Sequence, residues 1–78
     1  MNTVAPNLRS DRNLVRSIDR ALVRLVEERA RVLGKSGPMP DAESHRQDLA
    51  RRASGAFPAE FLERLFTLID AGCEEASQ

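Results

Sequence analysis

The stretch from residue 12 to residue 33 contains neither glycine nor proline, and its apolar residues recur with a helical period. These apolar positions are Leu14, Val15, Ile18, Leu22, Leu25, Val26, Val32 and Leu33. The spacing predicts one amphipathic helix of about six turns. It begins at about Arg12, behind a cap at Ser10 or Asp11. Two glycines and two prolines between residues 34 and 40 end it.

Two shorter helices are predicted after this break. The first runs from Asp41 to about Ser54, and the second starts near Phe57 with Pro58 in its first turn. No alternating strand pattern is found, so the chain is predicted to be all-α, with three helices and a long first one. Residues 1–8 are expected to form a flexible arm ahead of a helical domain at 9–77.

The apolar content favours an assembly over a lone monomer. Leu, Ile, Val and Phe together number 19 among the 78 residues. Burying these side chains offsets only part of the entropy lost on ordering three helices. A dimer or larger assembly is therefore expected.

Several classes of function are excluded by composition. No apolar run approaches the length of a membrane span, and no secretory signal is visible, so a cytoplasmic protein is expected. One cysteine and one histidine are too few for a disulfide or a common zinc site, and we expect no metal or cofactor. Residues 1–35 carry a net charge of +4 and residues 36–78 one of −4, which cancel. A neutral chain, with no aromatic residue among its arginines, argues against nucleic acid as a partner.

One stripe of the first predicted helix mixes apolar and charged residues. Seven residues alternately three and four apart form it: Arg12, Val15, Asp19, Leu22, Val26, Arg29 and Leu33. Arg29 is the most interior of the charged members. An unpaired guanidinium buried there would cost several kcal/mol. Arg29 must extend to solvent, pair with a carboxylate on another helix, or face a cavity that receives an anion.

The spacing of Arg12 and Arg29 bears on the last alternative. They are 17 residues apart, which is roughly 25 Å along a helix. One small ligand cannot touch both within a single chain. In an antiparallel dimer, Arg12 of one chain approaches the Arg29 region of the other, and two guanidinium forks suit a small dicarboxylate.

The other polar residues have simpler interpretations. Five arginines form a solvated basic face opposite the mixed stripe: Arg9, Arg16, Arg20, Arg24 and Arg31. Lys35 is expected to cap the end of the first helix. His45 is expected at the surface, and Cys73 as a small buried packing residue.

The first predicted helix contains Arg12, Ile18-Asp19, Leu22, Leu25, Val26 and Glu28-Arg29. In these residues and their spacing the chain resembles the all-helical chorismate mutase family. The run from Phe61 to Ile69 is similar to the family's third helix, and His45 to Ala53 corresponds to the second. The resemblance covers roughly residues 9–77.

The resemblance implies an intertwined homodimer that rearranges chorismate to prephenate, in aromatic amino acid or related secondary metabolism. The reaction needs no covalent step, so the site holds a compact conformer and stabilises developing charge. Two arginines, one from each chain, clamp the substrate carboxylates. By the match these are Arg29 and the partner's Arg12, both as catalytic and as substrate-binding residues.

Other positions depart from the family's pattern. Its ether-oxygen donor is a lysine further along a longer first helix, and Lys35, the nearest candidate here, lies a turn and more too early. The second-helix Arg-Glu pair reads His45 and Arg46. The third-helix polar positions read Cys73 and Ser77. Two hypotheses follow: a chorismate mutase with a rearranged site, or a non-catalytic helical dimer that binds a partner protein or an anionic ligand.

Overall fold

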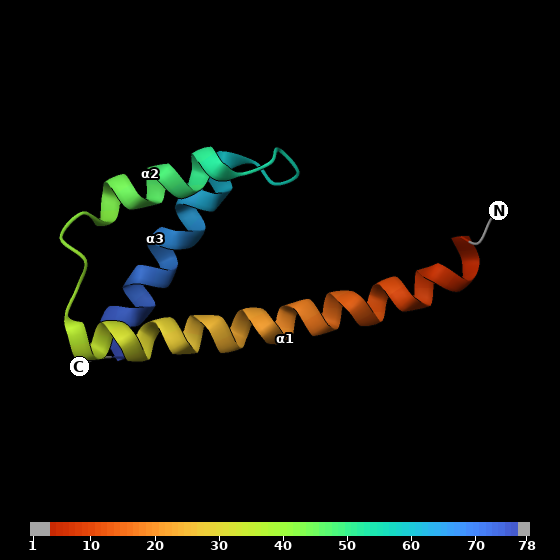
Figure 1. Ribbon diagram of the computed structural model, residues 1–78, viewed down its shortest axis with the longest axis horizontal. Helices are drawn as coiled ribbons and strands as arrows, with labels where there is room; N and C mark the ends of the chain where they lie inside the picture. Colours follow the sequence, from red (N-terminus) through yellow and green to blue (C-terminus); the bar gives the residue numbers. More distant parts are fainter. Residues whose placement is uncertain (1–3, 77–78) are drawn as a thin grey trace.

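The computed structural model describes residues 4–76, with side chains from residue 9 onward, and contains the three predicted helices (Figure 1). They are α1 (Val4–Ser36), α2 (Ala42–Arg52) and α3 (Ala59–Ala76). Residues 4–76 contain no strand, so the prediction of an all-α chain with a long first helix is confirmed. None of these helices has both the length and the apolar character to cross a bilayer.

The start of α1 differs from the prediction. The helix begins at Val4, eight residues before Arg12, and so includes most of the expected N-terminal arm. Pro6 does not prevent this, because in the first helical turn a backbone N–H has no intrahelical partner to lose. The capping residues predicted at Ser10 or Asp11 therefore lie inside the helix. Residues 1–3 fall outside the described range, and the flexibility of the arm stays a prediction.

The predicted break after α1 is built on one left-handed residue. Gly37 has a φ of 84°, and its N–H donates to the Leu33 carbonyl at 2.8 Å. This geometry caps the last carbonyls of the helix, and glycine adopts it without a steric penalty. Lys35 lies in the last turn, where its positive charge faces the negative end of the helix dipole. The turn redirects the chain towards α2.

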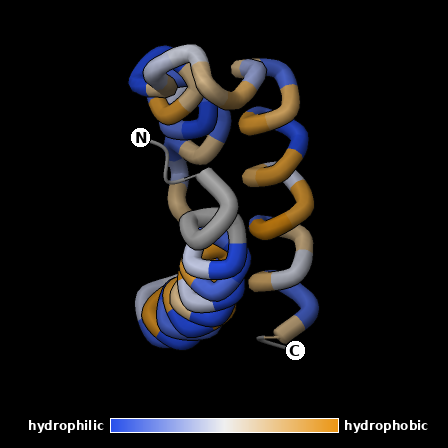
Figure 2. The backbone as a smooth tube through the Cα atoms, turned by 90° about the vertical axis from the view of Figure 1, so that its right-hand side faces the viewer, coloured by the Kyte–Doolittle hydropathy of each residue, from blue (hydrophilic) through white to orange (hydrophobic). Residues whose placement is uncertain are grey.

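Helix α3 holds the other two helices together. It packs against both α1 and α2, whereas α1 and α2 do not pack on each other. Figure 1 shows α3 running from α2 to the C-terminal end of α1, while the N-terminal half of α1 extends away from both. In the view along α1, α3 stands beside it as a separate column (Figure 2). The packed part of the molecule is therefore confined to one end of α1.

The chain is far more open than a compact domain of its size. Its radius of gyration is 16.1 Å, whereas a compact domain of this length has about 11.5 Å. It exposes 6433 Å², whereas a compact monomer of its mass exposes about 4,700 Å². Among the described residues only Ala50 and Cys73 form a buried apolar core. The exposed large apolar side chains are Leu14, Val15, Ile18, Leu22, Val23, Leu25, Val26, Val32, Phe57, Phe61, Leu65 and Leu68.

Two glycines near the end of α1 provide a matched test of the local geometry. Neither Gly34 nor Gly37 has an atom within 4 Å of the position a Cβ would take, so only the backbone conformation separates them. We expect Gly37→Ala to lower the free energy of unfolding by about 1 kcal/mol, because alanine is strained at positive φ. We expect Gly34→Ala to raise it by about 0.5–1 kcal/mol, because alanine favours the helix. Urea unfolding of both variants measures these changes in the free energy of unfolding. Changes of the same sign in the two variants would contradict the cap at Gly37.

Candidate functional site

The carboxylate of Asp70 joins two arginines from different helices. Nη2 of Arg29 donates to Oδ1 of Asp70 at 2.6 Å, and Nη1 of Arg46 donates to Oδ2 at 2.8 Å. Each carboxylate oxygen thus serves one guanidinium. These three residues, hereafter the arginine cluster, come one from each helix and carry a net charge of +1.

Helical spacing places the cluster on α3. Phe66, Asp70 and Cys73 are four and three residues apart, so they share one face of the helix. Arg29 reaches this face from α1: its guanidinium carbon lies 5.7 Å from the centre of the Phe66 ring, and Nη1 contacts Sγ of Cys73 at 3.5 Å. Arg46 approaches from α2. The aromatic ring and the sulfur give the Arg29 guanidinium a partly apolar seat that orients it towards Asp70.

The cluster is largely shielded from water. The side chains of Arg29 and Arg46 are 22% exposed and that of Asp70 is 24% exposed. Burial alone would raise the pKa of Asp70, but hydrogen bonds and positive charge from both arginines outweigh it, and the pKa lies below its ordinary value. Burial likewise acts to lower the pKa of Arg29, and the bond to Asp70 reverses the sign. Asp70 and Arg29 are therefore both charged at neutral pH.

A hollow of about 520 Å³ opens beside the cluster, between the end of α1, the following turn and α3. Its lining residues are Leu33, Gly34, Gly37, Pro38, Met39, Ala42, Asp70, Cys73 and Glu74. Asp70 is the one member of the cluster that lines it. The hollow is mainly apolar and large enough for a small organic acid.

The predicted site residues are brought together only in part. Arg29, Arg46 and Cys73 meet at the cluster. Arg12 is exposed on the same helix as Arg29 and roughly 25 Å from it along the axis, as expected. Lys35 is exposed about 9 Å beyond Arg29 along α1.

Two further predicted residues lie elsewhere. His45 is half-buried on α2 and is therefore less exposed than expected. Its electrostatic interaction is with the charge of Asp48, and not with the arginine cluster. Ser77 lies outside the described residues. Cys73 is 6% exposed, which confirms its predicted burial.

Of the three alternatives for Arg29, the structure shows the pairing with a carboxylate on another helix. That carboxylate was not among the predicted site residues. A signal was available: Asp70 is a charged residue on the apolar face of α3, between Phe66 and Cys73, just as Arg29 lies between Val26 and Leu33. Two opposite charges on two apolar faces indicate a buried pair.

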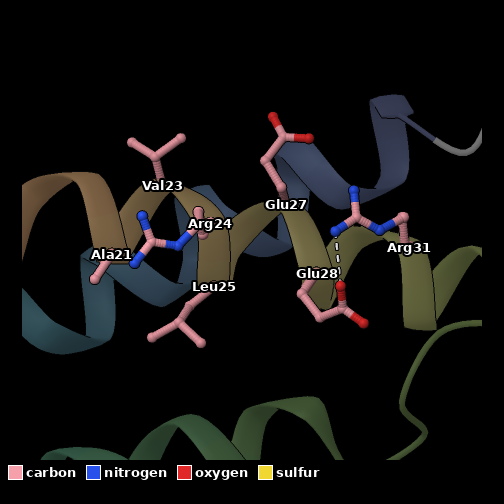
Figure 3. Close-up of a pocket in the computed structure, with 7 residues that line it drawn as sticks. All are labelled: Ala21, Val23, Arg24, Leu25, Glu27, Glu28 and Arg31. Carbon is pink, nitrogen blue, oxygen red and sulfur yellow. Dashed lines mark hydrogen bonds and ion pairs between the residues drawn. The ribbon is translucent and has the colours of Figure 1, made fainter.

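The remaining surface depressions are not comparable sites. The one of about 580 Å³ is lined by residues 21–31 of α1 alone, and Figure 3 shows Val23 and Leu25 pointing to opposite sides of the helix. The dashed line in Figure 3 marks the exposed pair of Arg31 and Glu28, at 2.6 Å. A groove of about 310 Å³ between α1 and α3 is lined mainly by small and apolar residues, including Val26 and Leu68. Residues 4–76 contain no group of three or more potential metal ligands.

Comparisons of the chain with protein-family models, with curated proteins and with solved structures each give no match. The relation to chorismate mutases therefore rests on the residues quoted above and stays a prediction.

The arginine cluster predicts a specific dependence of stability on pH. Because the pKa of Asp70 is lowered by folding, its pairs stabilise the fold fully above the unfolded aspartate value of about 3.9. That contribution is lost as the pH falls through the lowered pKa. We expect Asp70→Asn to lower the free energy of unfolding by about 1–3 kcal/mol at pH 7. We also expect it to flatten the loss of stability below about pH 4.

The matched control is Asp48→Asn. Asp48 also pairs with two arginines, Arg51 and Arg52, but its side chain is 40% exposed. Its pH profile in urea unfolding should stay close to that of the wild type. Equal profiles for Asp70→Asn and the wild type would show that the cluster contributes no stability.

Proposed function

We propose that this chain is a chorismate mutase-like protein that binds a small dicarboxylate in a site shared across a homodimer. The observation that carries the proposal is the arginine cluster, in which Arg29 and Arg46 converge from two helices beside a hollow. Guanidinium pairs are well suited to planar carboxylates. The residues that resemble the family place Arg29 in the carboxylate clamp, and Arg29 is the residue at the centre of the cluster.

The exposed surface supports self-association. Each chain exposes about 1,700 Å² more than a compact monomer of its mass. Burying that excess on two chains gives an interface of about 3,400 Å², within the range of obligate homodimers. The exposed apolar face of α1, which includes Val15, Ile18 and Leu22, is the longest stretch of this exposed surface along the sequence. A second copy of the chain presents the same apolar face and so complements it.

Charge supports a dicarboxylate as the ligand. When two α1 helices lie antiparallel, Arg12 of the partner subunit approaches Arg29. Arg12 of the partner subunit and the arginine cluster then bring together three guanidinium groups and the carboxylate of Asp70, which leaves two positive charges among these four residues. A ligand with two carboxylates supplies a charge of −2 that matches these four residues, while Glu74 adds a further negative charge at the hollow.

The proposed mechanism requires binding and electrostatics alone. Arg29 and Arg12 of the partner subunit hold the two carboxylates of chorismate, which restricts it to the compact conformer that rearranges. Arg46, Cys73, His45 and Ser77 are proposed to line the rest of the site. Lys35 is the proposed cation at the ether oxygen, where negative charge develops. No side chain forms a covalent bond with the substrate.

The second candidate is a non-catalytic helical dimer that binds an anion or a partner protein. Asp70 favours it, because this carboxylate already satisfies Arg29 and Arg46. The exposed position of Lys35, away from the cluster, favours it as well. In this candidate the arginine cluster serves mainly to hold three helices together.

Chorismate consumption separates the two candidates. We expect the purified protein to deplete chorismate, and Arg29→Ala to lower kcat/KM by about 100-fold or more, because a clamp and an electrostatic donor are lost together. Arg20→Ala, which removes an exposed arginine from the opposite face of α1, is the control and should keep wild-type turnover. The absence of turnover in the wild type would defeat the enzyme proposal; chorismate binding without turnover would support the second candidate.

Analytical ultracentrifugation tests the dimer. At micromolar concentration we expect a species of twice the 8.7 kDa chain mass. Ile18→Glu should shift it towards the monomer, because a carboxylate would be buried in the apolar face of α1. Arg20→Glu changes the solvated face and should leave the dimer intact. A wild-type monomer at this concentration would remove the shared site.

A further inference from the structure

Asp70 occupies the arginine cluster in the way that a bound carboxylate would. Its two oxygens are split between two guanidinium groups, at 2.6 Å from Arg29 and 2.8 Å from Arg46. These lengths are those of strong charge-assisted hydrogen bonds. An external carboxylate could adopt the same bridging geometry only by displacing Asp70 or by using the remaining N–H groups of the arginines.

The position of Asp70 at the hollow also affects an incoming anion. Asp70 lines the hollow of about 520 Å³, whereas Arg29 and Arg46 do not. An anion in the hollow therefore lies against the carboxylate-bearing residues Asp70 and Glu74, and against neither arginine of the cluster. When two carboxylates are in direct contact, the repulsion between them is several times stronger in a shielded site than in bulk water.

The backbone leaves Asp70 little freedom to withdraw. The residue lies within α3, six residues before its last residue, Ala76, and it is flanked on its own face by Phe66 and Cys73. Phe66 and Cys73 also contact Arg29. The residues that orient Arg29 thus lie on the same face of α3 as the carboxylate that Arg29 binds.

We propose that Asp70 is an internal counter-ion that holds the place of a ligand carboxylate between Arg29 and Arg46, and so sets the affinity and selectivity of the site. This inference rests on the proposed function in one respect, that the cluster accepts an anion. With Asp70 in place the cluster has one net positive charge, and without it two. The wild-type site therefore binds small carboxylates weakly, and removal of the Asp70 charge strengthens their binding.

Chemical rescue of Asp70→Ala tests whether an external carboxylate can take the vacated place. Thermal unfolding is followed by circular dichroism in sodium acetate and in sodium chloride at equal ionic strength. We expect acetate to raise the Tm of Asp70→Ala by about 5 °C over chloride, because binding to the folded state stabilises it. The acetate effect on the wild type and on Asp48→Ala should be much smaller. An equal acetate effect on all three proteins would overturn the proposal.

A variant of nearly the same shape covers the case in which Asp70→Ala does not fold. Asp70→Asn keeps the size of the side chain and removes its charge. Calorimetric titration with succinate should give a dissociation constant at least about tenfold lower for Asp70→Asn than for the wild type, with Asp48→Asn unchanged. Equal or weaker binding by Asp70→Asn, or no binding by any of the three proteins, would show that Asp70 does not hold a ligand's place.

The result of the succinate titration is independent of the result of the chorismate assay. Tighter succinate binding by Asp70→Asn, together with no chorismate turnover by the wild type, would leave this inference standing and defeat the enzyme proposal. Chorismate turnover by the wild type, together with unchanged succinate binding by Asp70→Asn, would do the reverse.

Discussion

The ion pairs from Asp70 to Arg29 and Arg46 connect all three helices, which share only a small buried apolar core. Helices α1 and α2 share no packing, and each meets only α3. With Ala50 and Cys73 as the buried apolar residues of the described chain, van der Waals packing alone defines their positions poorly. We interpret the pairing of one partly buried carboxylate with both outer helices as a constraint on their angle and register, which is the best-attested use of such a charge.

The proposed role of Asp70 places fold stability and ligand binding in conflict at this site. A guanidinium pair in a shielded place needs a counter-charge whether or not a ligand is present. If the chain supplies that charge itself, the fold of a single protomer is secured but the site attracts anions less strongly. If a ligand supplies it, the fold depends on the ligand. Proteins commonly balance stability against activity in this manner.

The sequence predicted the elements better than their contacts. The long apolar period of residues 12–33 and the glycines and prolines after it identified the helices, because both signals are local. The predicted start of α1 was wrong, because proline breaks a helix only beyond the first turn and Pro6 lies within that turn. The mixed stripe singled out Arg29 and left three possible environments for it. Asp70 was missed because helical periodicity gives the face of a residue and not its register against another helix.

Arg12 illustrates a different limit. Its position on α1 follows from sequence, but its proposed role depends on a second chain, and no property of one protomer defines that contact. Arg46 was identified through the resemblance alone, and its meeting with Arg29 through Asp70 follows from the packing of α2 on α3. Local signals therefore located the charged residues, and tertiary structure determined which of them meet.

The free half of α1 also has a consequence for how the chain folds. From residue 9 to residue 20 every side chain is exposed, so this segment has no tertiary contact to sustain it. Helices without such contacts are only marginally stable in water. The end of α1 is held by contacts with α3 such as that of Arg29 with Asp70, which joins residues 41 apart in sequence, whereas the exposed residues 9–20 need another surface to become stably ordered. If that surface is the second copy of the chain proposed above, ordering of the free half is a second-order event whose rate rises with the concentration of the chain.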